Sequence, residues 1–236
     1  MILQKPTDVE IVYFSLECSD KKRQYFYQLL NNEEKERADR YRFDIHRNRF
    51  ITGRGTVREI LAHIGKTKPQ RIKFEVNSYG KPAIYEPEGL TGLKFNASSS
   101  HTMGVIAVAN NIELGVDIEF IKLDSDTEDY DSIVSSEFTE EEYEWYNAQV
   151  RQDKVQMFYS IWTCKEAYLK ALGIGLNEKL NSFSINFKHH QPKISYTQLE
   201  SDDQSDFSLH QIMNPAGYIT CLAIPGVHFN IKLSGW

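Results

Sequence analysis

A single segment, Phe158 to Gly175, constrains the folding of this 236-residue chain more than any other. Wound as an α-helix at about 100° per residue, it gathers its aromatic and aliphatic side chains into one apolar stripe. Lys165 falls in the middle of that stripe, and Glu166 and Lys170 lie side by side along its edge. A lysine that faces a core loses hydration worth several kcal/mol unless an anion meets its ammonium group. We therefore expect a negative group on the core side of this helix.

Two purely structural interpretations of the same residues compete with a functional one. The stem of Lys165 could lie on Trp162 while its ammonium group reaches water. Glu166 and Lys170 could form an ordinary exposed ion pair worth a few tenths of a kcal/mol. The helix alone does not decide among these interpretations.

Charge is distributed unevenly along the sequence. The net charge of -6 disfavours nucleic acid as a general partner. Lys21 to Arg58 is nevertheless rich in lysine and arginine, whereas Asp124 to Glu144 contains many acids and neither lysine nor arginine. We expect one face of the protein to attract a polyanion and another to repel it.

The cysteines and the hydrophobic runs indicate the compartment. Cys18, Cys164 and Cys221 are far apart and form no C-x-x-C pair, so neither a disulfide framework nor a zinc site is predicted. The first residues lack a basic region followed by an apolar core, and no apolar run is long enough to cross a membrane. A cytoplasmic protein without a membrane partner is expected.

The segment Leu114 to Phe120 is the second element with chemical character. In a β-strand, alternation places Asp117 and Glu119 on one face, about 7 Å apart. Two carboxylates this close raise each other's pKa or share a cation. Oxygen ligands without histidine or cysteine suit Mg²⁺ or Mn²⁺, and Mg²⁺ commonly joins protein carboxylates to phosphate oxygens. A solvated strand face is the structural alternative.

Helices and strands alternate in both halves of the sequence. Strands are predicted at 10–16, 71–76, 105–109 and 114–120, with Asn110-Asn111 as a tight hairpin turn between the last two. Strands of a second sheet are predicted at 181–187, 193–197, 207–212 and 218–224. A long helix is predicted at 44–64. No G-x-G-x-x-G follows a strand, so a Rossmann fold is disfavoured and the pattern predicts an α+β fold.

Several short motifs together point to one family. G-V-D-I-E at 115–119 and W-T-C-K-E-A-Y-L-K at 162–170 resemble the two signature motifs of the Sfp-type 4'-phosphopantetheinyl transferases. Their separation also fits this family, as do F-T-E-E-E-Y between them, G-K-P at 80–82 and F-N-x-S at 95–98. The resemblance covers essentially the whole chain.

The resemblance implies a fold and an activity. The fold would be two pseudo-symmetric α+β halves, each a small antiparallel sheet packed on helices. Residues 1–112 would form the half on the adenosine-phosphate side of coenzyme A, and residues 113–236 the half with the Mg²⁺ and catalytic motifs. The enzyme would move 4'-phosphopantetheine from coenzyme A to a serine of an apo acyl or peptidyl carrier protein and release 3',5'-ADP. A pseudo-symmetric single chain suggests a monomer.

The resemblance also implies roles for individual residues. Asp117, Glu119 and Glu166 match the Mg²⁺ ligands of the family. Asp117 would thereby also be a coenzyme-binding residue. Glu166 matches the proposed base for the carrier serine, and Lys170 matches the residue that grips the pyrophosphate. Lys165 would serve the phosphates or orient Glu166. The positions that hold the adenosine phosphates are matched by Arg49, Lys81, Ser98 and Ser99.

One departure from the family pattern concerns the 3'-phosphate. The family usually has F-N-x-S-H-S, with the histidine on this phosphate, whereas this chain has F-N-A-S-S-S-H. Ser99 occupies the expected place of the histidine, and His101 follows two residues later. Either His101 serves the phosphate in a shifted bend, or Ser99 and backbone amides replace it.

Two other functions compete with phosphopantetheine transfer. A Mg²⁺-dependent phosphodiesterase or nuclease would use an acid pair, but Glu166 and Lys170 are spaced for a helix and the net acidity disfavours a nucleic-acid substrate. A non-catalytic binder of coenzyme A or of a carrier protein would be expected to have lost a carboxylate, and all three are present.

Overall fold

The computed structural model describes residues 8–122, 127–175, 179–187, 191–198, 207–226 and 229–236. They form two compact units. The first unit contains the described residues of Met1–Val76, Pro82–Asn111 and Asn230–Trp236, and the second contains those of Asn77–Lys81 and Ile112–Phe229. The assignment of functional roles to residues 1–112 and 113–236 stays a prediction.

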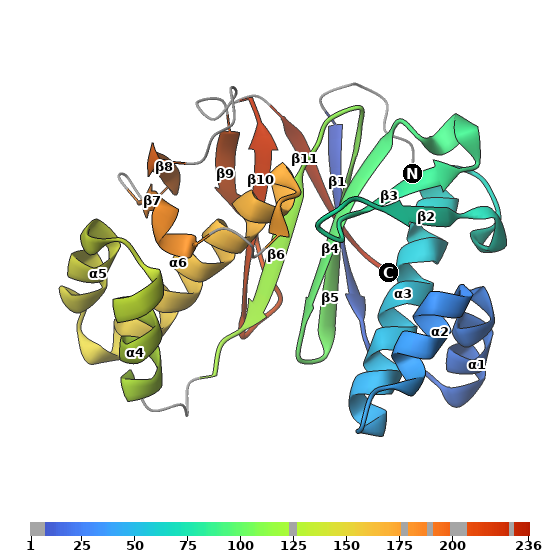
Figure 1. The fold of residues 1–236 in the computed structure, drawn as a ribbon, viewed down its shortest axis with the longest axis horizontal. Coiled ribbons are helices and arrows are strands. Elements are labelled where there is room, and N and C mark those ends of the chain that lie inside the picture. The colour runs from blue at the N-terminus through green and yellow to red at the C-terminus, as the bar shows by residue number, and fades with distance from the viewer. Residues whose placement is uncertain (1–7, 123–126, 176–178, 188–190, 199–206, 227–228) are drawn as a thin grey trace. The chain divides into compact units, whose positions relative to one another are not determined.

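The first unit is built on a four-stranded sheet in the order β11-β1-β5-β4. Strand β1 (Asp8–Ser15) pairs antiparallel with β5 (Met103–Asn110) and parallel with β11 (Asn230–Gly235), while β4 (Leu93–Ser100) forms a hairpin with β5 (Figure 1). Strands β2 (Lys73–Val76) and β3 (Pro82–Glu86) form a separate two-stranded sheet.

Three helices accompany this sheet: α1 (Asp20–Leu29), α2 (Asn32–Asp39) and α3 (Asp44–Ile64). Helix α3 has the bounds predicted from the sequence. It buries Ile60 and Leu61 in a core shared with Phe14 and Ile106 of the sheet. Helix α2 begins with a capping box in which Asn31 and Glu34 satisfy each other's backbone amides. These helices therefore hold their charged faces at fixed positions beside the sheet.

The second unit combines a three-stranded and a two-stranded antiparallel sheet. The first has the order β6-β10-β9, from β6 (Gly115–Phe120), β10 (Tyr218–Pro225) and β9 (Phe207–Gln211). The second pairs β7 (Phe183–Asn186) with β8 (Lys193–Thr197). The helices are α4 (Thr127–Glu137), α5 (Glu140–Asn147) and α6 (Arg151–Leu172). Short 3-10 turns in the two units span Pro69–Arg71, Glu88–Leu90 and Leu180–Ser182.

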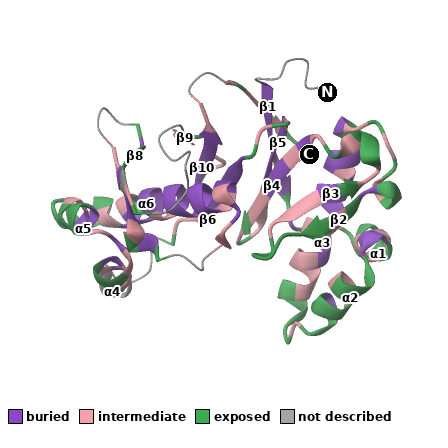
Figure 2. Cartoon of the chain, turned by 45° about the horizontal axis from the view of Figure 1, so that its top comes forward, coloured by how far each residue is buried: buried purple, intermediate pink, exposed green. Residues whose placement is uncertain are grey.

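Helix α6, which includes Phe158 to Leu172, is mostly buried (Figure 2). It lies directly on β6 because Gly115 has no side chain: a Cβ atom there would overlap the carbonyl oxygen of Ala167 and the amide nitrogen of Ala171. The helix ends at Gly173, whose φ of 72° is left-handed and whose amide donates to Leu169. The packing of α6 on β6 brings both signature motifs together.

The α+β class is confirmed, whereas two details of strand pairing are wrong. The predicted hairpin between 105–109 and 114–120 is not formed, because both edges of β5 are taken by β1 and β4 and β6 pairs with β10. The four later strands do not share one sheet either, because β10 carries β6 and β9 on its two edges and β7 and β8 pair with each other.

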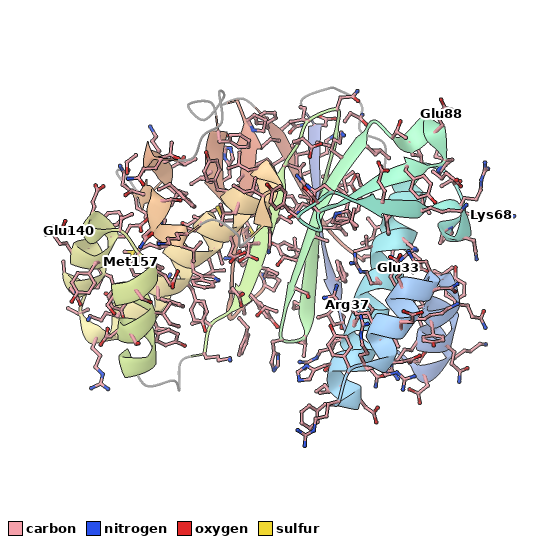
Figure 3. The ribbon with its side chains drawn as sticks, viewed as in Figure 1. Glu33, Arg37, Lys68, Glu88, Glu140 and Met157 are labelled. Carbon is pink, nitrogen blue, oxygen red and sulfur yellow. The ribbon has the colours of Figure 1, made fainter. Side chains whose placement is uncertain are left out.

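Charged side chains lie mainly on the surface of each unit. Glu33, Lys68 and Glu140 are examples of exposed charged residues (Figure 3). Within the described part of the chain, every helix is too short or too polar to cross a membrane.

Candidate functional site

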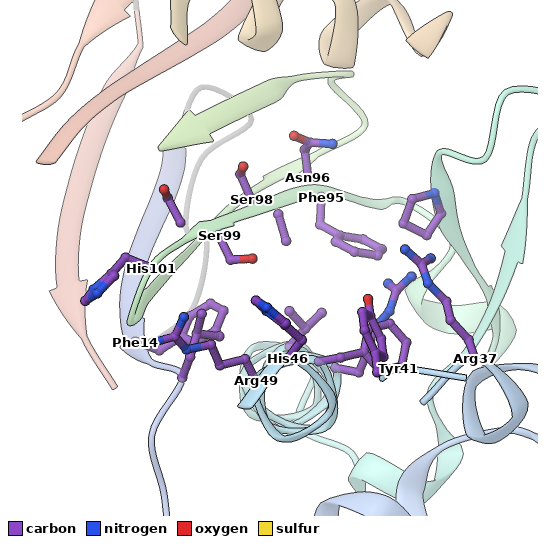
Figure 4. A pocket seen from close by; sticks show the side chains of 18 residues that line it. Phe14, Arg37, Tyr41, His46, Arg49, Phe95, Asn96, Ser98, Ser99 and His101 are labelled. Atoms are coloured by element: carbon purple, nitrogen blue, oxygen red, sulfur yellow. The ribbon is translucent and has the colours of Figure 1, made fainter. Parts of the chain in front are cut away.

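A cavity of about 670 Å³ lies in the first unit between α3 and β4 (Figure 4). We call it the arginine pocket, because Arg37, Arg49 and Arg54 line it. Helix α3 forms one wall, and residues 95 to 101 form the other. Its lining combines cationic groups with hydroxyl groups, which suits a ligand with several phosphates.

Four of the residues predicted for the coenzyme meet in the arginine pocket. Arg49 projects from α3, Ser98 and Ser99 come from β4, and His101 follows in the turn to β5 with a φ of 51° (Figure 4). The buried Nε of Arg49 has no hydrogen-bond partner among the described residues. A guanidinium group in this state can still donate to a ligand in the pocket.

Arg37 and Arg54 were missed as individual site residues, although the basic segment that contains them was noted. Their guanidinium groups lie 5.1 and 5.8 Å from the ring of Phe50, an arrangement that holds both at the pocket wall. Burial lowers the pKa of Arg54. Glu34 opposes this effect, because its Oε1 lies 3.6 Å from Nε of Arg54. Glu34 is in turn bound by Arg58 at 2.7 Å. The pocket thus keeps an excess of positive charge.

The predicted acidic residues lie in the second unit, where α6 packs on β6. Asp117 and Glu119 are on β6, and Glu166 and Lys170 are on α6. The ammonium group of Lys170 lies 2.5 Å from Oδ1 of Asp117. Asp117 and Glu166 are buried, whereas Glu119 and Lys170 are half-buried. We call Asp117, Glu119 and Glu166 the acidic site.

The electrostatics of Glu166 show that these side chains influence one another. Burial raises the pKa of Glu166 to about 7, and the like charges of Asp117 and Glu119 add to the rise. The ammonium group of Lys170 counteracts it. Glu166 is therefore a carboxylate that accepts a proton near neutral pH.

The acidic site suits a magnesium ion in its chemical type. Three carboxylates without nitrogen or sulfur ligands are a hard donor set, and their repulsion of one another is what a cation would relieve. Among the described residues, no three acidic, histidine or cysteine side chains converge closely enough to hold a metal as they stand. Lys170 holds Asp117 instead, so an ion would compete with this ammonium group for the carboxylate.

Lys81, which was predicted at the adenosine phosphates, lies in the second unit and outside the arginine pocket. Its ammonium group donates to the carboxylate of Glu113 at 2.9 Å, to the carbonyl oxygen of Ala171 at 3.0 Å and to that of Leu114 at 3.3 Å. Its neighbours are therefore the end of α6 and the chain before β6.

Lys165 is directed away from the acidic site. Its side chain is fully buried, and its ammonium group lies 2.9 Å from Glu142 and donates to the carbonyl oxygens of Leu180 and Phe183. The negative group expected on the core side of the helix is thus Glu142, and the alternative in which Lys165 reaches water is wrong. The sequence F-T-E-E-E-Y also has the pattern of a capping box, and Thr139 and Glu142 form this box at the start of α5. Lys165 contacts α5 and the start of β7, so a direct contact with phosphates is not supported.

Two family profiles and several curated proteins match this chain. The profile of the 4'-phosphopantetheinyl transferase N-terminal domain matches residues 17–112, and that of the 4'-phosphopantetheinyl transferase superfamily matches residues 113–223. The 4'-phosphopantetheinyl transferase HetI of Nostoc sp. strain PCC 7120 is 34% identical over 185 residues, which are 78% of this chain and 76% of HetI. The chain belongs to the 4'-phosphopantetheinyl transferase family.

Other members of the family are also similar to this transferase. The 4'-phosphopantetheinyl transferase gsp of Aneurinibacillus migulanus is 30% identical over a region that covers 79% of this chain and 68% of the gsp chain. The 4'-phosphopantetheinyl transferase Sfp of Bacillus subtilis strain 168 is 25% identical over 91% of both chains. The crystal structure of Thermotoga maritima holo-[acyl-carrier-protein] synthase matches 50% of this chain and 65% of its own at 18% identity, with a TM-score of 0.38 that carries no weight.

Proposed function

We propose that this transferase moves the 4'-phosphopantetheine moiety of coenzyme A to a serine of an apo acyl or peptidyl carrier protein and releases 3',5'-ADP. The observation that carries the proposal is the arrangement of Glu166 and Lys170 beside Asp117, on the two signature motifs of the family. The arginine pocket supplies the counter-charge that a polyanionic coenzyme requires.

The phosphates of the 3',5'-ADP portion would bind in the arginine pocket. Arg49 supplies a guanidinium group whose buried Nε is unpaired among the described residues. Ser98 and Ser99 offer hydroxyl donors, and His101 offers a ring nitrogen from the same wall. Because Ser99 and His101 both line the pocket, both alternatives for the missing family histidine stay open to test.

The acidic site would hold one Mg²⁺ through Asp117, Glu119 and Glu166. When bound, such an ion neutralises charge that develops on diphosphate oxygens during transfer. Lys170 supplies a positive charge to the same oxygens from its place beside Asp117. Lys170 would thus place an ammonium group near the negative charge of the diphosphate in a largely buried site.

Glu166 would act as the general base. A carboxylate within hydrogen-bond reach of a hydroxyl group can take its proton as the new bond forms. The serine oxygen forms a bond to the phosphorus that carries pantetheine, and the bond from this phosphorus to the bridging diphosphate oxygen breaks. The serine proton passes to Glu166, directly or through water, and the electron pair leaves with 3',5'-ADP.

The other parts of the proposal concern partners and place of action. The expected partners are coenzyme A and an apo carrier protein in the cytoplasm, and the enzyme would act as a monomer without nucleic acid. Residues 1–112 would serve the adenosine phosphates, and residues 113–236 would serve catalysis.

Mass spectrometry of several apo carrier proteins, incubated with coenzyme A and Mg²⁺, tests the function. The native enzyme should add the mass of phosphopantetheine to at least one carrier, and Glu166→Gln should not. Glu144→Gln, which changes an exposed glutamate of α5, is the matched control and should label like the native enzyme. Equal labelling by Glu166→Gln would remove Glu166 from the mechanism, and no labelling of any carrier would contradict the function.

A further inference from the structure

The turn Asn77–Lys81 is part of the second unit, where it lies against the C-terminal end of α6. We propose that Asn77 and Lys81 are positioning residues that hold the end of α6 against the start of β6, and so fix the relative placement of Lys170 and Asp117. The expected effect on catalysis rests on the proposed function, whereas the expected effect on the placement of α6 does not.

Lys81 connects the two elements through a nearly buried ammonium group. The side chain is 14% exposed and has three acceptors, which are the carbonyl oxygens of Ala171 and Leu114 and the carboxylate of Glu113. Carbonyl groups in the last turn of a helix have no partner within the helix, and a cation there also interacts favourably with the helix dipole. Lys81 therefore caps α6 from outside the helix while it holds the chain that enters β6.

Asn77 makes the turn rigid and adds a second connection to α6. Its Nδ2 donates to the carbonyl oxygen of Gly173 at 2.9 Å. Its Oδ1 accepts from the backbone amides of Tyr79 at 3.0 Å and Lys81 at 2.9 Å. The same amide side chain thus orders the turn that presents Lys81 and binds the residue at which α6 ends.

The contacts fall next to the residues that carry the chemistry. Ala171 directly follows Lys170 on α6, and Leu114 lies three residues before Asp117. The Lys170 ammonium group and the Asp117 carboxylate are 2.5 Å apart, a distance that depends on the register of α6 on β6. A shift of about 1 Å in such a site can cost roughly 100-fold in rate. Lys81 would therefore affect turnover without touching the reacting atoms.

The test compares Lys81→Met, Lys81→Arg and Asn77→Ala with the native enzyme. Three quantities are measured: hydrogen exchange of the backbone amides at the end of α6, the affinity for 3',5'-ADP, and kcat for carrier labelling. Lys73→Met is the matched control, because Lys73 is a lysine of the neighbouring strand β2 that is 55% exposed and pairs with Glu86.

We expect Lys81→Met and Asn77→Ala to accelerate exchange at Gly173 and the preceding turn by roughly tenfold, and to lower kcat by about as much. Affinity for 3',5'-ADP should stay within about twofold of the native value, because neither Asn77 nor Lys81 lines the arginine pocket. Lys81→Arg should recover much of both losses, and Lys73→Met should change none of the three quantities.

Two results would overturn the inference. Weaker 3',5'-ADP binding by Lys81→Met with native exchange would make Lys81 a phosphate ligand instead. Native exchange and native kcat in both variants would remove any positioning role. Failure of the native enzyme to label carriers would contradict the proposed function. Because hydrogen exchange is measured without a carrier protein, the comparison of exchange rates would still decide this inference.

Discussion

The ammonium group of Lys165 lies 2.9 Å from the carboxylate of Glu142, and neither side chain is exposed to solvent. The carboxylate also accepts from the backbone amides of Thr139 at 2.9 Å and Ile185 at 2.7 Å. Burial lowers the pKa of Lys165, and Glu142 opposes this effect. The pair therefore joins α5, α6 and β7 through charges that compensate each other, and the ring of Phe183 lies 4.4 Å from the ammonium group.

Lys165→Met should destabilise the protein strongly, because it leaves the buried Glu142 carboxylate without its counter-charge. Breaking one side of a buried pair costs about 3–5 kcal/mol. The double variant Lys165→Met with Glu142→Gln should recover part of that loss, since neither charge remains. Urea unfolding measures the free energies. Lys73→Met, at a lysine 55% exposed whose partner Glu86 is 47% exposed, is the control and should lose much less; an equal loss in both single variants would contradict the prediction.

The sequence could predict the presence of the Lys165 counter-charge but not its direction or its identity. Periodicity places Lys165 on the apolar stripe, which requires an anion, yet the choice of Glu142 depends on how α5 and β7 pack around α6. Glu142 was recognised only as a cap, because a capping box is a local pattern and a buried ion pair is not. The acceptors of Lys81 were missed for the same reason, because no sequence motif reveals that two backbone carbonyl oxygens and the carboxylate of Glu113 surround its ammonium group.

The pairing of strands also could not be predicted from the sequence. Asn110-Asn111 has the residues of a hairpin turn, but β5 finds its partners in β1 and β4, which are distant and adjacent in sequence respectively. By contrast, Asp117, Glu166 and Lys170 could be grouped in advance because two specific motifs carry them. Arg37 could not, since an arginine in a basic segment is mostly a surface residue until a cavity is seen beside it.

Gly115→Ala should disturb the packing of α6 on β6. The added methyl group would overlap backbone atoms of Ala167 and Ala171, which cannot rotate away, so the helix must move. Overpacking of this kind costs about 1–3 kcal/mol or more. Urea unfolding and carrier labelling should both show a loss. Gly89→Ala, where nothing lies within 4 Å of the added atom, is the matched control. A native-like Gly115→Ala variant would show that the helix does not depend on this contact.

Arg49→Leu should weaken binding of 3',5'-ADP by roughly 10- to 100-fold, because hydrogen bonds to charged groups contribute about 1.5–3 kcal/mol each. Isothermal titration calorimetry measures the affinity. Arg47→Leu is the matched control: Arg47 is on the same helix but lines a different cavity, between α1 and α3. We expect Arg47→Leu to bind within a few-fold of the native enzyme. Equal losses in the two variants would mean that general positive charge, and not the arginine pocket, attracts the nucleotide.

His210→Gln should make stability less sensitive to acid. His210 lies on β9 with Nε2 2.9 Å from the hydroxyl of Ser208, and burial lowers its pKa below the ordinary value of 6.5. The unfolded chain therefore takes up a proton at a higher pH than the folded protein does. The stability contributed by neutral His210 is fully present above about pH 6.5 and is lost as the pH falls through the lower pKa of the folded state.

Urea unfolding at about pH 7 and about pH 5 tests the role of His210, because this interval lies around the pKa of an unperturbed histidine. His210→Gln should lose less free energy of unfolding between the two pH values than the native protein loses. Ser208→Ala removes the hydrogen bond but keeps the titrating ring, so it should retain the native pH dependence. An acid sensitivity of His210→Gln equal to that of the native protein would show that other groups, and not this buried imidazole, govern stability in that interval.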